Sequence, residues 1–549
     1  MELRTGRHGR TSTDHATGVR SAWQRWYGTS IATRVRTFLK QVCPLPVVLG
    51  VSASLRNARY GRGNEALVRD LADLSDQSAL TEWLCTQTQI RFQDFVDAGR
   101  GEKLPFDAIY DRLRRLRGER GLSNSEAAVA AALWGALQEG AEIRHLSLAH
   151  HFPMTGKARD LAKLRQSLIE ADAIVISGPV YFGDRGSLTQ SLIDFIAADP
   201  ALRDACAGKV YAGLAVGAKR NGGQETTLIY QLLDMVNLDF LAVGNSSETT
   251  SQYGGTAVAG DVGALHKDAE GIETCVGTGQ RAARTAALLT RGRAEGGRLE
   301  DRLKLQLWLL QDAADGTGRR YFDAWAAEAM AADPNLDVQV LGVTNVQVLR
   351  CIACDVCPVD VGPKEDYRCI IKAPGDFFVQ HHKTLTEADA VLLCAYSPQD
   401  RSQVISVYQQ FIERTRYLRR DNYVFSDLLM APFVISELSA RQNLHLRMLT
   451  SAVRHHTVLH HPLIGLIHEG RILGEADLRQ RAADFITRAR ELTVGRYLSG
   501  LREDVIYQPK GYDISAQKAV EDLATGRTRD SIQANARAHV TNARRRMAN

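Results

Sequence analysis

Short apolar runs that end in small or polar residues recur along the first half of the chain. They are Val47–Ser52 and the runs at 143–148, 172–177 and 209–216. Amphipathic segments separate them, and this alternation is typical of βαβ units that build a parallel sheet. Similar runs follow at 305–310, 338–343 and 389–395. The pattern predicts an α/β protein with two tandem, doubly wound parallel sheets, over residues 46–295 and 300–498.

Residues 57–122 interrupt the first β/α alternation with charged, helix-periodic sequence. We expect helices at about 65–74, 79–98 and 106–117. After them, Ser123-Asn124-Ser125-Glu126 provides N-capping chemistry for a helix that runs to Gln138. We therefore predict a helical insertion, serving as a lid or a partner surface, and we expect the helix that begins at Ser123 to return to the loop after the first strand.

Composition and charge narrow the choice of partners. The chain has 549 residues, of which 44% are hydrophobic and 24% charged, which is ordinary for a folded protein of two or three domains. Its net charge is 68 − 63 = +5, too small over this length to indicate a dedicated nucleic-acid binder. No run reaches the roughly 18 apolar residues that a membrane span needs. We expect a cytoplasmic protein with no membrane association.

The two ends of the chain differ from the rest. Residues 1–45 hold eight Arg or Lys residues against two acids and are interpreted as a basic N-terminal arm. Residues 499–549 look helical and polar, with little apolar surface to bury, and are interpreted as a C-terminal extension that carries no chemistry.

Four of the nine cysteines, Cys351, Cys354, Cys357 and Cys369, fall within 19 residues. Three thiolates at successive two-residue gaps, completed by a more distant fourth, suit a [4Fe-4S] cluster. Zinc is the alternative, although zinc is commonly held by two separated ligand pairs. The pattern favours the cluster.

Three loops follow apolar runs with groups suited to a ligand. Ser52-Ala53-Ser54-Leu55-Arg56 offers hydroxyls, amides and a guanidinium that fit a phosphate monoester. The stretch 178–183 places backbone amides beside an aromatic residue, which suits a planar ring, and Gly222-Gly223 permits close backbone approach. Each loop alone could be an ordinary turn. Together they follow the strand ends at which open parallel sheets bind ligands.

These residues give the chain a resemblance to the flavodoxin-like NAD(P)H-dependent FMN reductases, and specifically to the iron–sulfur flavoproteins. The resemblance covers about residues 45–290, interrupted by 57–122, and also rests on Gln252-Tyr253-Gly254-Gly255 with Asp268. It implies that the FMN phosphate is bound by Ser52, Ser54, Arg56, Asn124 and Ser125. It also implies that the flavin ring is lined by Pro179, Val180, Tyr181, Phe182, Gly183, Gly222, Gly223 and Gln224.

The second half departs from this pattern. It carries the cysteines where the resembling family has its cluster, with a longer last gap before Cys369, but reads 396–400 and 435–439 at the ring loops. Asp312 and Asp315 are poor neighbours for a phosphate dianion. We therefore expect one FMN in the first half and one cluster in a degenerate second half.

The predicted function is a flavin-dependent oxidoreductase that couples FMN to the [4Fe-4S] cluster, for electron transfer or reduction of a small organic substrate. NAD(P)H or a ferredoxin is the expected donor, and the resemblance implies a homo-oligomer. Two alternatives stay open: an FMN or quinone reductase with a structural zinc site, and a non-enzymatic redox sensor or scaffold.

Overall fold

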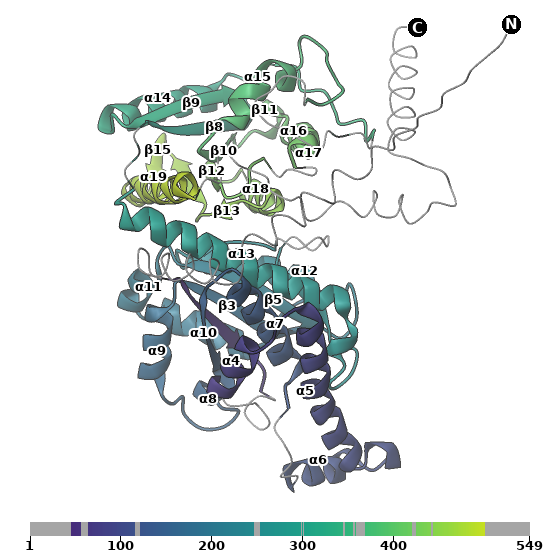
Figure 1. Cartoon of the computed structure of the whole chain (residues 1–549). Coiled ribbons are helices and arrows are strands. Elements are labelled where there is room, and N and C mark those ends of the chain that lie inside the picture. Colours follow the sequence, from purple (N-terminus) through teal and green to yellow (C-terminus); the bar gives the residue numbers. More distant parts are fainter. Residues whose placement is uncertain are drawn as a thin grey trace, which may run out of the picture. The chain divides into compact units, whose positions relative to one another are not determined.

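The computed structural model describes residues 45–55, 64–115, 121–245, 253–297, 299, 301–343, 346–354, 357, 368–419, 424–440 and 443–499. Every element below lies in one compact unit, Pro46–Asn549 (Figure 1). The predicted N-terminal arm up to residue 44 and the C-terminal extension after Ser499 lie outside the described residues.

Five parallel strands form the sheet of the first half. They are β1 (Val47–Ser52), β2 (Glu142–Ser147), β3 (Ala173–Tyr181), β5 (Val210–Gly217) and β7 (Gly255–Val258). Their order is β2-β1-β3-β5-β7, and each neighbouring pair is parallel. This is the flavodoxin-like order, so the predicted flavodoxin-like α/β fold is confirmed. The short strands β4 (Asp184–Arg185) and β6 (Leu241–Ala242) pair with β3 and β5.

The second half repeats this strand order. Its strands β8 (Leu303–Ala313), β9 (Leu336–Gly342), β10 (Ala390–Ser397), β12 (Leu429–Glu437) and β14 (Leu463–His468) lie in the parallel order β9-β8-β10-β12-β14. Shorter strands β11 (Val404–Ser406), β13 (Val458–Leu459) and β15 (Arg471–Leu473) extend it. The segment Ile435–Glu437, expected in a ring loop, continues strand β12 instead, because all three residues pair with β14.

The two halves share one continuous sheet. Strands β6 and β13 pair antiparallel, with Leu459 opposite Ala242, and this contact joins the strands of both halves in one path. The sequence predicts two sheets because nothing local in it specifies pairing between short strands so far apart. The domain boundaries at 295 and 300 stay predictions.

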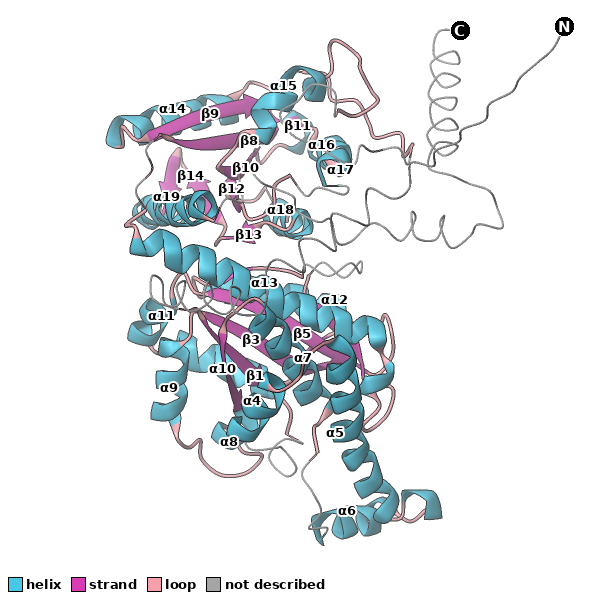
Figure 2. Cartoon of the chain, in the orientation of Figure 1, coloured by secondary structure: helices cyan, strands magenta, loops and turns pink. Residues whose placement is uncertain are grey.

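Helices cover both faces of the sheet (Figure 2). One face is packed by α7 (Asn124–Gln138), α13 (Ala269–Ala294), α14 (Thr317–Ala332) and α19 (Glu475–Leu498). The other is packed by α8 (Leu148–His151), α9 (Leu161–Glu170), α10 (Ser187–Ala197), α11 (Pro200–Cys206), α12 (Gln224–Asn237), α15 (Phe377–Thr386), α16 (Tyr408–Arg414), α17 (Arg416–Arg419) and α18 (Leu444–Ala452). Each face buries a hydrophobic cluster that includes residues of both halves. Alternating side chains of the buried strands supply both clusters.

Three helices lie between β1 and α7: α4 (Asn64–Ala72), α5 (Gln77–Asp97) and α6 (Phe106–Arg115). They begin and end within a few residues of the ranges that the sequence predicts. Leu67 and Leu71 of α4 and Leu80 and Leu84 of α5 are buried in the core of the first half. The two helices are therefore part of the folded core, and a lid role stays a prediction.

Glycines allow the long helix α13 to touch its neighbours closely (Figure 1). A Cβ added at Gly279 would overlap the Ala132 carbonyl of α7. At the other end of α13, a Cβ on Gly292 would overlap the Glu491 carbonyl of α19, and one on Gly495 would overlap the Leu288 carbonyl. The last contact is reciprocal, as in a contact across a two-fold axis.

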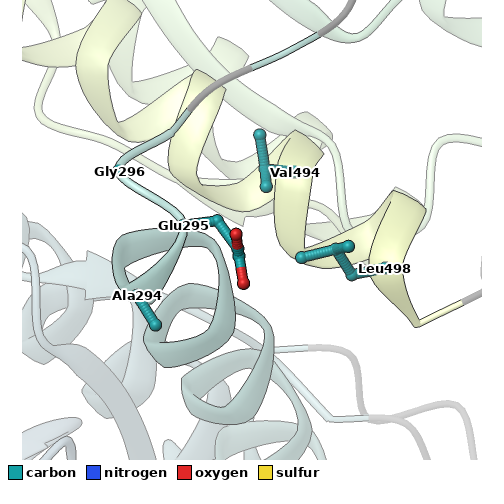
Figure 3. Close-up of a pocket in the computed structure, with 5 residues that line it drawn as sticks. All are labelled: Ala294, Glu295, Gly296, Val494 and Leu498. Carbon is teal, nitrogen blue, oxygen red and sulfur yellow. The ribbon is translucent and has the colours of Figure 1, made fainter.

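Beyond this crossing, the ends of α13 and α19 enclose a cavity of about 420 Å³. Figure 3 shows Glu295 reaching toward Val494 and Leu498. One carboxylate among small and apolar groups offers little chemistry. Among the described helices, none is both long and apolar enough to cross a membrane.

Candidate functional site

The carboxyl ends of β1, β3 and β5 meet at one edge of the sheet. Ser52 lies opposite Ser177 in the β1–β3 register, and Pro179 lies opposite Val216 in the β3–β5 register. The three loops that the sequence singles out therefore leave the sheet side by side, at the edge where such sheets bind ligands.

In the first loop, Ser52 is fully buried and turned toward β2. Its Oγ lies 2.9 Å from Nε2 of His145, and Nδ1 of that ring lies 2.9 Å from Oδ1 of Asn64. Burial lowers the pKa of His145 to about 4, so the imidazole is neutral at physiological pH. Ser54 is also buried, and Arg56 lies outside the described residues. Sequence reasoning missed His145, which lies opposite Gly50 on the neighbouring strand; the usable signal was a histidine within the apolar run at 143–148.

The helix after the insertion begins as predicted. Ser123 and Glu126 form a capping box, and burial raises the pKa of Glu126 to about 8. The Asn124 side chain donates to the Asp261 carbonyl at 3.0 Å and accepts from the Leu265 amide at 3.4 Å, so it holds the 261–265 loop.

The first amides of this helix are open. Among the residues that the structure describes, no protein group accepts a hydrogen bond from the backbone amides of Asn124 and Ser125. Free amides at a helix N-terminus favour an anion. This end of α7 therefore has the chemistry that a phosphate needs.

The loop after β3 is a tight hairpin to β4. Val180 pairs with Arg185 and Tyr181 with Asp184, which leaves Phe182 and Gly183 as the turn, with φ of 54° and 79°. A bulky residue in the left-handed region is strained. The Phe182 ring is fully exposed, and Tyr181 is 58% exposed. Pro179 and Val180 support the hairpin at the end of the strand.

The loop after β5 packs on this hairpin. Gly223 has φ of 99°, and a Cβ placed on it would lie 2.8 Å from the Gly183 Cα. The Gln224 side-chain amide donates through Nε2 to the Lys219 carbonyl at 2.8 Å and accepts through Oε1 from the Gly222 backbone amide at 2.8 Å. Gln224 thus shapes the loop, and its predicted contact with a flavin stays a prediction. The two ring loops are together in space.

The corresponding helix of the second half has its N-terminus filled. The Asp312 carboxylate accepts from the amides of Gly318 at 2.7 Å and Arg319 at 3.0 Å, at the start of α14. Asp315 accepts from the Thr317 amide at 3.0 Å. The sequence predicts that these acids disfavour a phosphate. It does not predict that their carboxylates bind the amides at the start of α14, where a phosphate would otherwise lie.

The ring loop of the second half is closed by a second carboxylate. The Tyr396 hydroxyl donates to Oε1 of Glu437 at 2.8 Å, and the Gln399 amide donates to Oε2 at 2.8 Å. Sequence reasoning missed Glu437 as an internal acceptor, because its partners are about 40 residues away in the chain.

The four cysteines lie between β9 and α15, and all four are half-buried. Burial raises the pKa of the Cys369 thiol, and Cys354 and Cys351 add to this rise, so both lie within electrostatic reach of Cys369. Within the described ranges, no three His, Cys, Asp or Glu side chains converge as a metal site.

A buried ion pair fixes the segment that leads into these cysteines. Arg414 of α16 lies 2.8 Å from Asp376, and both side chains are almost fully buried. Asp376 accepts from the Leu349 amide at 2.9 Å, and Arg414 donates to the Leu349 carbonyl at 3.2 Å. The core of the second half therefore positions the backbone two residues before Cys351.

A family model described as NADPH-dependent FMN reductase matches residues 118–252. An iron–sulfur flavoprotein of Methanocaldococcus jannaschii is 31% identical over 182 residues, which are 30% of this chain and 92% of that protein. An iron–sulfur flavoprotein of Methanosarcina thermophila is 33% identical over 89 residues, 16% of this chain and 46% of that protein.

A solved structure of a WrbA-like flavodoxin from Agrobacterium tumefaciens is 15% identical, covers 44% of this chain and 97% of its own, and has a TM-score of 0.23. The family assignment rests on the sequence matches, because the alignment with the Methanocaldococcus jannaschii iron–sulfur flavoprotein covers 92% of that protein. The chain belongs to the NADPH-dependent FMN reductase and iron–sulfur flavoprotein family, and it is by class an FMN-dependent oxidoreductase.

Proposed function

We propose that each chain binds one FMN in its first half and one [4Fe-4S] cluster on Cys351, Cys354, Cys357 and Cys369, and passes electrons between them. The contrast between the two helix N-termini carries the single-flavin part of this proposal. Among the described residues, no group accepts from the amides of Asn124 and Ser125 on α7, whereas Asp312 accepts from the amides of α14. A carboxylate already in the anion position excludes a phosphate by charge and by volume.

In the first half, the α7 amides, Ser54, Ser125 and Arg56 would hold the phosphate of FMN. Ser52 and Asn124 would act through the loops that they fix, since their side chains bond to His145 and to the 261–265 loop. The exposed Tyr181 and Phe182 rings and the backbone of Gly222 and Gly223 would lie against the flavin. Aromatic faces suit a planar ring system.

In the second half, the chemistry of the donor set suits an iron–sulfur cluster, although no three of the described thiols converge. Four thiols lie on one loop, with Cys351 and Cys354 within electrostatic reach of Cys369, and the Arg414–Asp376 pair anchors the backbone at Leu349. Thiolates are the ligands that such clusters take. The loop residues between these cysteines, 355–356 and 358–367, lie outside the described residues.

When bound, FMN supplies two-electron chemistry and the cluster one-electron chemistry. NAD(P)H or a ferredoxin would be the donor, and a small organic molecule or a one-electron carrier the acceptor. The reciprocal contact of Gly292 and Gly495 supports a fused pair of flavodoxin-like domains, and a homo-oligomer of this pair is part of the proposal.

The test is anaerobic purification with FMN, iron, sulfide and zinc quantified per chain. We expect about one FMN and about four irons. Cys354→Ala should remove the cluster's visible absorption and keep FMN. Cys85→Ser, at a half-buried thiol on α5, is the matched control and should keep both.

Two results would overturn the proposal. Zinc in place of iron would leave an FMN reductase with a structural metal site. Two FMN per chain would contradict the role given to Asp312.

A further inference from the structure

An arginine-rich cavity lies beside the cysteine loop. It has a volume of about 550 Å³ and lies between α16–α17 and α18, with Tyr253 of the first half and Cys351 on its wall. Four guanidinium groups line it, from Arg416, Arg419, Arg447 and Arg454. No step of the proposed electron transfer uses these arginines.

The charge of this cavity is concentrated and one-sided. Among the described residues that line it, four arginines accompany one carboxylate, Glu413, which gives 4 − 1 = +3. His455 on the same wall adds no charge, because burial, helped by Arg419 and Arg454, lowers its pKa to about 3. Of the corresponding first-half helices, α10 and α12 contain no lysine or arginine, and the single arginine of α11, Arg203, pairs with Asp239. A cluster of four arginines is therefore absent from these first-half helices.

Internal contacts hold one of the arginines in place, and another lies near a tyrosine of the first half. Burial raises the pKa of the Tyr253 hydroxyl, and the nearby Arg454 guanidinium works against this rise. Arg447 stacks 4.8 Å from the Tyr408 ring centre and donates to Gln409 at 3.1 Å. The Tyr408 hydroxyl lies 2.6 Å from the Ser451 hydroxyl. Fixed guanidinium groups lose less conformational entropy on binding.

The wall also carries an unused polar atom. Within the described residues, Nδ1 of the buried His455 has no hydrogen-bond partner, while its Nε2 lies 3.1 Å from the Thr415 hydroxyl. A buried ring nitrogen without a partner is costly.

We propose that this cavity binds a small organic molecule that carries two or more carboxylate or phosphate groups. The volume is within the range of small-molecule sites, and guanidinium groups pair with both kinds of oxyanion. The proposal that this cavity binds an anion does not depend on the proposed electron transfer. The position of the ligand between the predicted cluster and the Gly222–Gln224 loop rests on that proposed function. Tyr253 on the cavity wall is close enough to Glu225, next to this loop, for the carboxylate to raise the pKa of the tyrosine.

Calorimetric titration of the full-length protein, purified with its cofactors, tests this site. Tricarballylate represents the tricarboxylates and fructose 1,6-bisphosphate the bisphosphates, with acetate and methyl phosphate as monoanion controls. We expect at least one polyanion to bind one per chain, about tenfold or more tightly than its monoanion. The polyanion that binds identifies carboxylate or phosphate as the preferred group.

Variants locate the binding. Arg454→Gln should weaken it about tenfold, the loss expected for one charged hydrogen bond. Arg479→Gln, at an exposed ion pair on α19, removes the same charge elsewhere and should change nothing. Thr450→Glu places a carboxylate on the cavity wall and should abolish binding with iron and FMN content unchanged.

The proposal fails if neither polyanion binds more tightly than its monoanion. It also fails if Arg479→Gln weakens binding as much as Arg454→Gln, because diffuse surface charge would then explain the affinity. If Arg454→Gln does not fold, Thr450→Glu decides, and unchanged binding in that variant overturns the site.

Discussion

At the scale of single residues, carboxylates decide where this chain can accept an anion. Asp312 satisfies the first amides of α14 from within the protein, whereas Glu126 caps α7 but leaves the amides of Asn124 and Ser125 open. The corresponding helix N-termini thus give an open site in one half and a closed site in the other. The difference lies in which residue reaches the helix end.

Asp312→Ala should destabilise the second half, because it strands the buried amides at the start of α14. Because this carboxylate accepts several backbone hydrogen bonds, we expect its removal to lower the free energy of unfolding by about 3 kcal/mol. Chemical denaturation would measure it. Asp315→Asn, at an exposed carboxylate on the same loop, is the control and should shift the midpoint little. Equal shifts would contradict the role of Asp312.

Glu126 should make stability depend on pH. Burial raises its pKa from an ordinary 4.5 to about 8, so the folded state keeps a proton that the unfolded chain releases. The contribution of protonated Glu126 to the free energy of unfolding is therefore fully present below about pH 4.5. It is lost as the pH rises toward 8, by at most about 1.4 kcal/mol per pH unit.

Glu126→Gln stays neutral and should escape this loss. Relative to the variant, the wild-type protein should become progressively less stable between pH 5 and pH 8, as measured by denaturation at several pH values. Parallel stability profiles over that range would show that Glu126 is ionised in the fold.

At the scale of elements, the long helix α13 connects the two halves by close backbone contacts. It crosses α7 at Gly279 and α19 at Gly292, where an added Cβ would overlap a carbonyl of the neighbouring helix. Helix propensity alone disfavours glycine at these positions. Packing between helices, and not local preference, therefore accounts for them.

Gly279→Ala should lower the free energy of unfolding by about 1–3 kcal/mol, because overpacking outweighs the propensity gain of alanine. Thermal unfolding of the holoprotein would measure the change. Gly101→Ala is the matched control, because no atom lies within 4 Å of the added Cβ. If Gly279→Ala raised the melting temperature, the close crossing would be wrong.

At the scale of the whole molecule, a buried ion pair supports the joint between the halves. Arg281 of α13 pairs with Asp427, next to strand β12, and donates to the His456 carbonyl, with both charged side chains almost fully buried. The β6–β13 pairing adds a backbone link. Both contacts connect residues more than 140 positions apart in the chain.

Arg281→Leu should cost about 3–5 kcal/mol, because it leaves the Asp427 carboxylate buried without its partner. The double variant Arg281→Leu with Asp427→Leu should recover part of that loss in chemical denaturation. Arg284→Gln, in a more exposed pair with Glu139, should cost less than about 1 kcal/mol. A double variant as unstable as Arg281→Leu would show that charge isolation is not the cause.

The sequence by itself determined the positions of most elements. Periodicity located the helix that runs to Gln138 and the strand at 47–52 to within a few residues, since local side-chain patterns specify them. The spacing of Cys351, Cys354 and Cys357 predicts metal ligation, and the loop residues predict which half suits a phosphate; both stay predictions.

Only the tertiary structure decided the partners. It turned Ser52 toward His145, seated Asp312 on the amides of α14, continued Ile435–Glu437 as strand β12 and joined both halves in one sheet. It also gathered four arginines from separate turns beside Cys351. These contacts join groups brought together by packing, and no local pattern of residues specifies which distant groups will meet.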